Sequence, residues 1–216
     1  MRRAVFLILL PLLLGVGLPL RAQSPHLGVS LNLLFPVGEF NSKTYPPYVD
    51  STGNVVPTQT EGYDLGLGGT FYLSFPMDRS LAMRLSFSGA SNTGTNTAPG
   101  QATINLRHSQ FNLGGELEIF PDGSAYRHRG LYFLGGISAD FEQFDRSFGD
   151  PGWDYTNTTR KSRMGATVGV GNTFGYDAGA RFTLELVYHA TITGNDLAAG
   201  DPPSTDYLRL GLGWVF

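Results

Sequence analysis

Apolar residues recur at every second position over eight separate segments of this chain. In the segment at residues 131–142, for example, Leu131, Phe133 and Ile137 alternate with polar or small residues. A β-strand turns successive side chains to opposite faces, so a period of two predicts strands and argues against a helical fold. The eight segments lie at residues 27–35, 63–75, 81–88, 111–119, 131–142, 163–171, 182–190 and 207–216.

Charged side chains lie on the face opposite the apolar one. Glu116 with Glu118, and Asp140 with Glu142, follow this rule. A soluble sandwich can leave such a face in water, whereas a membrane barrel turns its apolar face to lipid and its polar face inward. The number of segments is even, and most have close to the ~9–11 residues that cross a bilayer as tilted strands. The pattern therefore favours an all-β fold, an eight-stranded antiparallel up-and-down transmembrane β-barrel of the outer-membrane type.

The connectors alternate between long and short. The long ones, at residues 37–61, 91–107, 145–160 and 193–205, are polar and rich in Gly, Asn, Thr and Pro. The short ones lie at residues 76–80, 121–129 and 175–180. Outer-membrane barrels have short periplasmic turns and longer outer loops, so this order predicts four outer loops, three inner turns and both ends of the barrel on the periplasmic side.

An aromatic residue ends every second strand segment. These residues are Phe75, Phe120, Phe174 and Phe216. All four would lie at the inner end of a strand that runs toward the periplasm. Aromatic girdles at the membrane interfaces are typical of such barrels, so we expect these residues to form the inner girdle.

The first 22 residues have the layout of a secretory signal peptide. Arg2 and Arg3 precede an apolar run from Ala4 to Leu20, and a small residue, Ala22, precedes the expected cleavage site. An uncleaved membrane anchor is the alternative, which Pro11 and Pro19 disfavour. We therefore expect a signal peptide at residues 1–22 and a barrel domain at residues 23–216.

Composition excludes several classes of function. Charged residues make up 15% of the chain, below the usual ~25%, and the net charge is −3. This mildly acidic balance gives no basic surface for nucleic acid, so no nucleic-acid partner is expected. The chain has no Cys, which excludes disulfides, thiolate metal sites and thiol catalysis. We expect no cofactor and no metal.

The end of the chain resembles the C-terminal sorting strand of bacterial outer-membrane proteins, which finishes in an aromatic residue after alternating apolar ones. The residues that carry the resemblance are Tyr207, Leu210, Leu212, Trp214 and Phe216. The mature chain as a whole resembles the small OmpA/OmpX/OmpW-like outer-membrane β-barrel domains. That resemblance implies location in the bacterial outer membrane, insertion by the barrel-assembly machinery and contact with the lipid bilayer and lipopolysaccharide. Because the chain stops at Phe216, we expect the barrel alone, with no peptidoglycan-binding domain. The oligomeric state stays open.

Inward charges are expected to pair inside the barrel, because a buried charge is costly without a partner. Arg84 and Glu116 should lie at similar heights on neighbouring strands. Arg163 should meet Asp140 or Glu142, and Arg209 should lie diagonal to Glu185. The expected lumen set is Arg84, Glu116, Glu118, Asp140, Glu142, Arg163, Glu185 and Arg209.

These residues allow three functions. The first is a structural or surface-interaction role without catalysis, with the lumen closed by ion pairs. The second is a narrow channel for small ionic or apolar solutes. The third is a hydrolase, because His189-Ala190-Thr191 faintly resembles the His-x-Ser of outer-membrane lipid A deacylases. Here the hydroxyl belongs to Thr, and the strand phase points His189 into the lumen. We therefore expect no catalytic activity.

Overall fold

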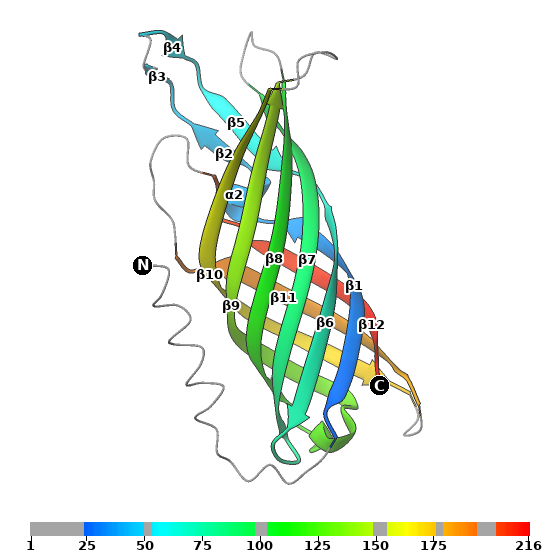
Figure 1. The fold of residues 1–216 in the computed structure, drawn as a ribbon. Helices are drawn as coiled ribbons and strands as arrows, with labels where there is room; N and C mark the ends of the chain where they lie inside the picture. Colours follow the sequence, from blue (N-terminus) through cyan, green and yellow to red (C-terminus); the bar gives the residue numbers. More distant parts are fainter. Residues whose placement is uncertain (1–23, 50–52, 98–102, 149–154, 176–178, 194–201) are drawn as a thin grey trace.

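The computed structural model describes residues 24–49, 53–97, 103–148, 155–175, 179–193 and 202–216. The expected signal peptide lies outside these ranges. Eight antiparallel strands close into a barrel (Figure 1). They are β1 (His26–Pro36), β6 (Gly66–Pro76), β7 (Leu81–Thr97), β8 (Ile104–Ile119), β9 (Gly130–Phe148), β10 (Tyr155–Phe174), β11 (Arg181–Thr191) and β12 (Tyr207–Val215).

Each strand pairs with its neighbours in the chain, and β1 pairs with β12 to close the barrel. At this closure Leu31 lies opposite Leu212. The order is therefore up-and-down throughout, and no barrel strand of the described chain is left without two neighbours. Closure removes the unpaired strand edges that an open sheet would expose.

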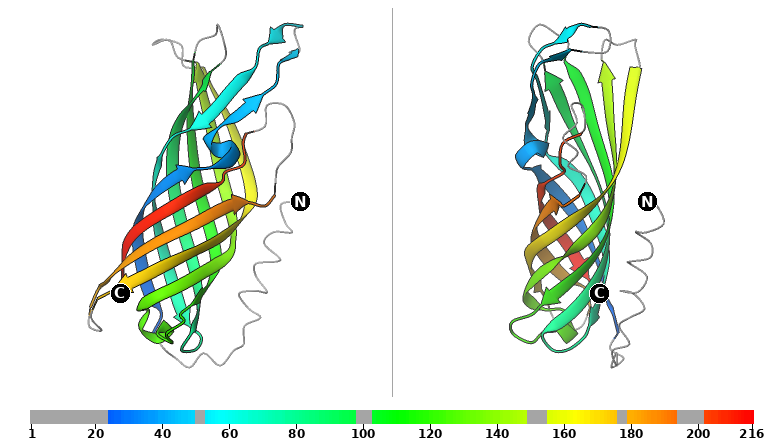
Figure 2. Two further views of the ribbon diagram at one scale, coloured as in Figure 1. Left: turned by 180° about the vertical axis from the view of Figure 1, so that it is seen from behind. Right: turned by 90° about the vertical axis from the view of Figure 1, so that its left-hand side faces the viewer.

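Four neighbouring strands are much longer than the others. β7, β8, β9 and β10 have 17, 16, 19 and 20 residues, whereas β12 has 9. Their extra length lies at the end opposite the short turns, where they form a wall that rises above the rest of the barrel (Figures 1 and 2). We call this end the outer end.

This wall corrects the prediction of long loops at residues 91–107 and 145–160. Most of those residues belong to strands that pair in register, for example Thr93 with Arg107 and Thr158 with Asp145. The sequence pattern missed them because their outward face is polar. A strand above the membrane faces water on that side, so the apolar alternation ends where the membrane ends.

The first outer connector also has structure. It contains α2 (Gly38–Asn41), β2 (Lys43–Tyr45), the β3–β4 pair (Tyr48–Val49 with Val55–Val56) and β5 (Gln59–Tyr63). β5 continues the line of β6 along β7, but the register shifts by one residue between Tyr63–Gly94 and Leu67–Ser91. This shift is a β-bulge, and it divides the strand expected at residues 63–75.

Large apolar side chains cover the outside of the barrel below the wall. Leu31, Leu67 and Val168 are 71%, 67% and 60% exposed, whereas Arg84 inside the barrel is fully buried. This distribution is the reverse of that in a soluble protein and fits a barrel whose outer surface meets lipid. We call this outward band the apolar belt. The described residues contain no helix long and apolar enough to cross a membrane.

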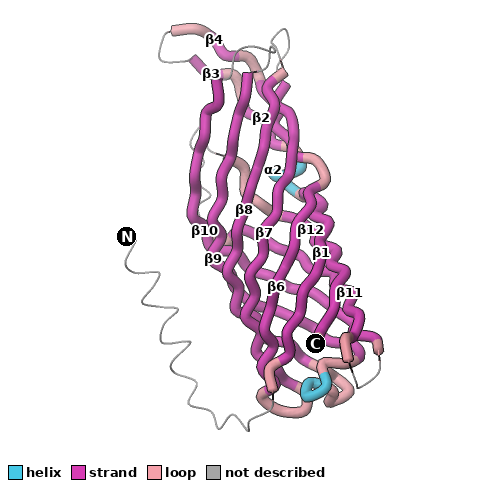
Figure 3. Tube along the Cα trace, turned by 45° about the vertical axis from the view of Figure 1, so that its right-hand side comes forward, coloured by secondary structure: helices cyan, strands magenta, loops and turns pink. Residues whose placement is uncertain are grey.

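The inner end has short connectors (Figure 3). The β6–β7 turn is held by Asp78, whose carboxylate accepts hydrogen bonds from the backbone N–H groups of Ser80 and Leu81, at 2.6 and 2.8 Å. These bonds, together with one from the Ser80 hydroxyl, lower the pKa of Asp78 below its ordinary value. The β8–β9 connector contains a short 3₁₀ helix, η1 (Ala125–Arg127).

Candidate functional site

A group of charged side chains fills the middle of the lumen. Arg84 of β7 is fully buried, and its Nε lies 3.1 Å from Oε2 of Glu116, its direct partner on β8. Its Nη1 lies 3.4 Å from Oε1 of Glu118. Both Nη atoms also bond Glu185, which reaches across the lumen from β11, and the Nη2–Oε2 distance is 3.2 Å. One guanidinium therefore holds three carboxylates, and we call this set the Arg84 cluster.

Further donors balance the three carboxylates of the cluster. The Tyr132 hydroxyl donates to Glu185 at 2.6 Å, and Arg209 lies 3.5 Å from the same carboxylate. Nε2 of His128 lies 3.2 Å from Glu118. The ring of Tyr72 faces the Arg84 guanidinium, whose Cζ lies 3.6 Å from the ring centre. Because buried charges are costly without partners, this network explains how the barrel tolerates charges in its lumen.

Glycines leave the room that these large groups need. A Cβ at Gly28 or at Gly171 would overlap the rings of Tyr72 and Tyr132, respectively. The small residues on the inward face of these strands therefore follow from the size of their neighbours in a narrow barrel.

An apolar plug, which we call the inner plug, adjoins the Arg84 cluster and includes residues of the inner β8–β9 connector. It consists of Ala82, Phe120, Ala125, Tyr132, Leu134 and Val187, and all of them are buried. Phe120 was expected in the inner girdle, but it is fully buried inside the barrel. The reason is its phase: the preceding residue, Ile119, is 51% exposed on the outward face, so Phe120 turns inward. Phe174 and Phe216 do face outward, with 48% and 56% exposure.

A second plug closes the lumen at the base of the wall. Phe40 of α2 packs into the barrel on Tyr63, and their ring centres are 4.8 Å apart. Leu106 and Phe144 complete this buried cluster, and His108 lies against Phe40 and Phe144. Sequence reasoning did not find Phe40, which lies in the loop expected at residues 37–61, or His108, which lies between the loop expected at residues 91–107 and the strand expected at residues 111–119.

The remaining predicted ion pairs lie between the two plugs. Arg163 lies opposite Asp140 in the register, but its ion pair is with Glu142, at 3.2 Å. Asp140 instead accepts hydrogen bonds from Asn112 at 2.6 Å and Ser138 at 2.7 Å, and lies 3.1 Å from Nε2 of His189. Among the expected lumen residues, the structure therefore brings Arg163 to Glu142 and leaves Asp140 to His189.

Arg163 also holds the last outer connector inside the barrel mouth. It donates to the carbonyl oxygens of Pro203 and Pro202, at 2.7 and 3.1 Å. Pro202, Pro203 and Thr205 are buried. Thr205 in turn bonds Glu142 through its hydroxyl. The segment at residues 202–206 therefore adds to the outer closure of the lumen, which strand patterning alone could not show.

The proposed hydrolase residues are not arranged for catalysis on lipid. His189 is 2% exposed, faces the lumen, and stacks on Tyr207 with ring centres 4.7 Å apart. The Thr191 hydroxyl accepts a hydrogen bond from the Thr205 backbone N–H at 3.1 Å. His189 instead bonds Asp140, so the imidazole of His189 and the hydroxyl of Thr191 each bond a different residue. A deacylase needs a hydroxyl and a base that meet each other and reach the lipid ester.

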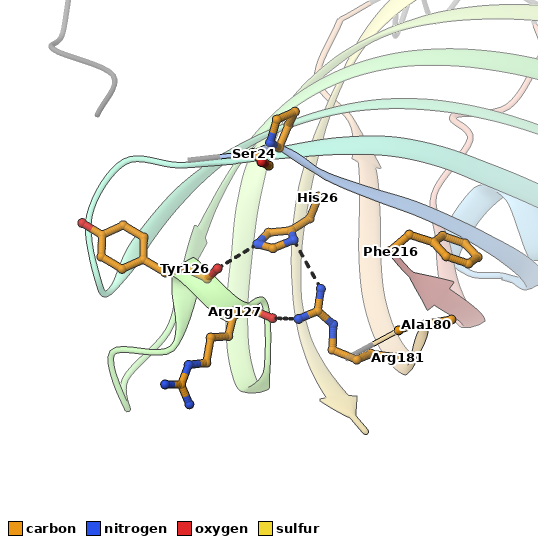
Figure 4. Close-up of a pocket in the computed structure, with 9 residues that line it drawn as sticks. Ser24, His26, Tyr126, Arg127, Ala180, Arg181 and Phe216 are labelled. Carbon is orange, nitrogen blue, oxygen red and sulfur yellow. Dashed lines mark hydrogen bonds between the residues drawn. The ribbon is translucent and has the colours of Figure 1, made fainter. Parts of the chain in front are cut away.

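The residues of the expected sorting strand divide between the two faces of β12. Leu212, Trp214 and Phe216 are 44–56% exposed on the apolar belt, with Leu210 on the same face, and Tyr207 is buried in the lumen. A hollow of about 640 Å³ lies at the inner end beside Phe216. Figure 4 shows His26 in this hollow between the Tyr126 carbonyl oxygen, 3.1 Å away, and the Arg181 guanidinium, 3.3 Å away.

No protein-family model and no curated protein sequence matches the chain. Solved structures do match it. OprG, an outer membrane protein of Pseudomonas aeruginosa, aligns with a TM-score of 0.57 at 11% identity, over 89% of this chain and 95% of that one. Ail of Yersinia pestis, described in complex with the heparin analogue sucrose octasulfate, aligns with a TM-score of 0.52 at 10% identity, over 89% and 97%.

The chain has the fold of the small outer-membrane β-barrels. The apolar belt agrees with this likeness, because a band of exposed Leu, Val and Phe is stable only against lipid. The predicted fold class and the predicted outer-membrane location are confirmed. The likeness to OprG and Ail concerns the fold, and function has to be argued from the chain's own residues.

Proposed function

We propose that this barrel has a structural or surface-interaction role, in which the closed lumen supports the fold and the outer wall makes the contacts. One observation carries the proposal: β7 to β10 continue far above the apolar belt, while side chains fill the lumen beneath them. From Phe141 to Phe148, for example, β9 continues for about 20–25 Å along its own direction at ~3.4 Å per residue. A wall of this height is not needed to cross the membrane.

The contents of the lumen support a barrel without transport. The lumen holds the inner plug, the Arg84 cluster, the Arg163–Glu142 pair and the outer plug. An eight-stranded barrel is just wide enough for side chains to fill it. The complex of Ail with a heparin analogue supports a role at the cell surface for a barrel of this shape.

A narrow channel is the second candidate, and unpaired polar atoms in the outer half of the lumen favour it. Asn92, Gln110, Asn112 and Thr167 each have one buried oxygen without a hydrogen-bond partner in the described structure. Buried polar groups of this kind usually bind ordered water. A chain of such waters would be the starting point for a conducting path.

Conductance separates the two candidates. The barrel refolded into planar bilayers should give no single-channel steps under an applied voltage, because two plugs and a fixed ion network block the lumen. Regular steps with a current proportional to voltage would overturn the proposed role and establish the channel.

We do not propose a hydrolase, and the acylation state of lipid A tests whether the barrel has such an activity. The wild type and His189→Ala should both leave the acylation of lipid A unchanged in a host that lacks a deacylase. Loss of one acyl chain with the wild type alone, seen as a lower lipid A mass, would show that the barrel is an enzyme.

A further inference from the structure

The short helix η1 and the residue after it, His128, cover the inner end of the lumen. Ala125 of η1 is fully buried in the inner plug, and so is the side chain of His128. The ring centre of His128 lies 5.3 Å from that of Phe120 and 5.2 Å from that of Tyr132. Among the described residues other than glycine, only His128 has a positive φ, of 43°. Such a conformation persists only where surrounding contacts enforce it, so this cover has to be held in place.

Two side chains at the hollow of the inner end hold the cover. His26, at the start of β1, bonds the carbonyl oxygen of Tyr126 through Nε2, at 3.1 Å. Arg181, at the start of β11, donates to the carbonyl oxygen of Arg127. Arg181 also bonds Nδ1 of His26, at 3.3 Å, so these bonds form one chain (Figure 4). Both carbonyl oxygens belong to η1, and the residue that follows is His128.

The partners of His26 fix its protonation state. A guanidinium group only donates hydrogen bonds, so Nδ1 of His26 accepts the bond from Arg181 and carries no proton. A carbonyl oxygen only accepts, so Nε2 carries the proton and donates to Tyr126. The ring is therefore neutral in the closed structure. A proton added at Nδ1 would turn two N–H groups and two positive charges toward each other, and the bond between His26 and Arg181 would be lost.

Other basic groups lie close to the ring of His26. The ring of His128 faces it at an angle of 68°, with ring centres 5.7 Å apart. Arg127 lines the same hollow, and Figure 4 shows its side chain directed away from His26. A protonated His26 would therefore meet the guanidinium of Arg181 at hydrogen-bond distance and a second imidazole on another side.

The carboxylates near this ring already have partners. Glu118 lies 3.4 Å from Nη1 of Arg84 and 3.2 Å from Nε2 of His128. The C-terminal residue, Phe216, lines the hollow, and its backbone oxygen accepts a hydrogen bond from the N–H of Leu27 at 3.2 Å. A charged imidazole would therefore gain less from these acids than it would lose beside the guanidinium.

We propose that protonation of His26 releases η1 and opens the inner end of the lumen to solvent. Above the ordinary imidazole pKa of about 6.5, the ring is neutral and the cover stays closed. As the pH falls below that value, the open form binds a proton that the closed form excludes, so the closed form loses stability. The outer plug contains none of these residues and stays in place. The switch goes beyond the proposed surface role, because it concerns the opposite end of the barrel.

The size of the effect follows from the protonation of an imidazole. At pH 5, an imidazole with an ordinary pKa has about thirty protonated copies for each neutral one. When only the open form binds this proton, the ratio of open to closed inner ends rises by up to about thirtyfold between pH 8 and pH 5.

Labelling of a thiol behind the cover measures this ratio. Thr183 is fully buried, and its hydroxyl lies 3.5 Å from that of Thr173, which lies 3.4 Å from Nδ1 of His128. The chain has no Cys, so Thr183→Cys provides a single thiol. The folded barrel in lipid nanodiscs reacts with a water-soluble mercurial at pH 8 and at pH 5. We expect its rate, relative to that of the exposed thiol in Thr158→Cys, to rise by up to about thirtyfold in acid.

Two changes at position 26 assign the response to His26. His26→Gln keeps a donor for the Tyr126 carbonyl oxygen and an acceptor for Arg181 but does not take up a proton, so the cover should stay closed at pH 5. His26→Lys carries a positive charge at both pH values and should open the cover at pH 8. His189→Gln changes a buried histidine elsewhere in the lumen and should respond to acid as the wild type does.

Several results would overturn the switch. An unchanged labelling rate of the wild type in acid would show that the cover stays closed, and an equal rise in His26→Gln would place the response at another group. The same conclusion would follow from slow labelling of folded His26→Lys at pH 8, or from a lost response in His189→Gln. The unboiled wild type should keep its folded gel mobility at pH 5. Loss of that mobility would mean that acid unfolds the whole barrel, which also contradicts a switch confined to η1.

Discussion

Replacing Arg84 is the sharpest test of the lumen. Arg84→Met keeps most of the side-chain volume but removes the charge that holds Glu116, Glu118 and Glu185. Removing one partner of a buried pair typically costs about 3–5 kcal/mol, because the other charge stays buried without compensation. Arg209 and His128, at 3.5 and 3.2 Å, are the basic groups that would remain beside these carboxylates, with neutral hydroxyl donors such as Tyr132. We therefore expect a loss of about 3–5 kcal/mol in the free energy of unfolding.

A double-mutant cycle isolates the contact with Glu116. The double variant Arg84→Met/Glu116→Gln should be less destabilised than the sum of the two single variants, because it leaves one carboxylate fewer unpaired. The coupling should fall within the ~0.5–3 kcal/mol seen for groups in one buried network. Urea unfolding in lipid vesicles, followed by the gel mobility of the unboiled protein, gives the four free energies. A coupling of zero would refute the reasoning, since it would mean that the two groups do not interact.

Three further changes test other parts of the barrel. Arg163→Gln should release the segment at residues 202–206, so that protease added outside the cell cleaves there faster than in the wild type. An unchanged cleavage rate would show that Arg163 does not hold this segment. Asp78→Asn should lower stability at neutral pH. The pKa of Asp78 is lowered in the folded state, so the stabilising effect of its carboxylate is complete above the ordinary pKa of 3.8 and is lost as the pH falls below that value. The stabilities of the wild type and the variant should therefore converge in acid. A constant difference in stability down to pH 2 would contradict this role of Asp78. Deleting Phe216 should sharply reduce the amount of assembled barrel in outer-membrane fractions, and normal assembly would show that the terminal aromatic is no sorting signal.

The barrel strands could be predicted from sequence because lipid imposes a strict rule on them. Every outward residue within the membrane must be apolar or small, so the period of two is clear in segments such as residues 131–142. Contacts between neighbouring strands, such as Arg84 with Glu116, could also be inferred, because they depend only on register.

The other contacts and the outer wall could not be predicted, because they depend on features that the sequence of a single strand does not show. Glu185 reaches Arg84 across the lumen, and Arg163 chooses Glu142 over the directly opposite Asp140. The first contact depends on how the closed barrel brings the distant strands β7 and β11 together. The second is a diagonal contact between the neighbouring strands β9 and β10, where His189 from β11 bonds Asp140. The wall was predicted as loops because water on its outer face removes the apolar signal. Phe40 enters the lumen from a connector, where alternation gives no direction, whereas Phe120 turns inward because Ile119 before it faces outward.

A cysteine scan along β8 tests the central claim, a closed barrel in the membrane below an outer wall. The chain has no native Cys, so each variant carries one thiol. Single cysteines at positions 105–119 are tested in the folded, membrane-embedded protein with a water-soluble thiol reagent and with a quencher attached to lipid chains. Odd positions from 111 to 119 should be reached only from lipid, positions 105, 107 and 109 only from water, and even positions from neither. Rapid reaction of the even positions with the water-soluble reagent would contradict a closed lumen, and the absence of a boundary between positions 109 and 111 would contradict the placement of the membrane.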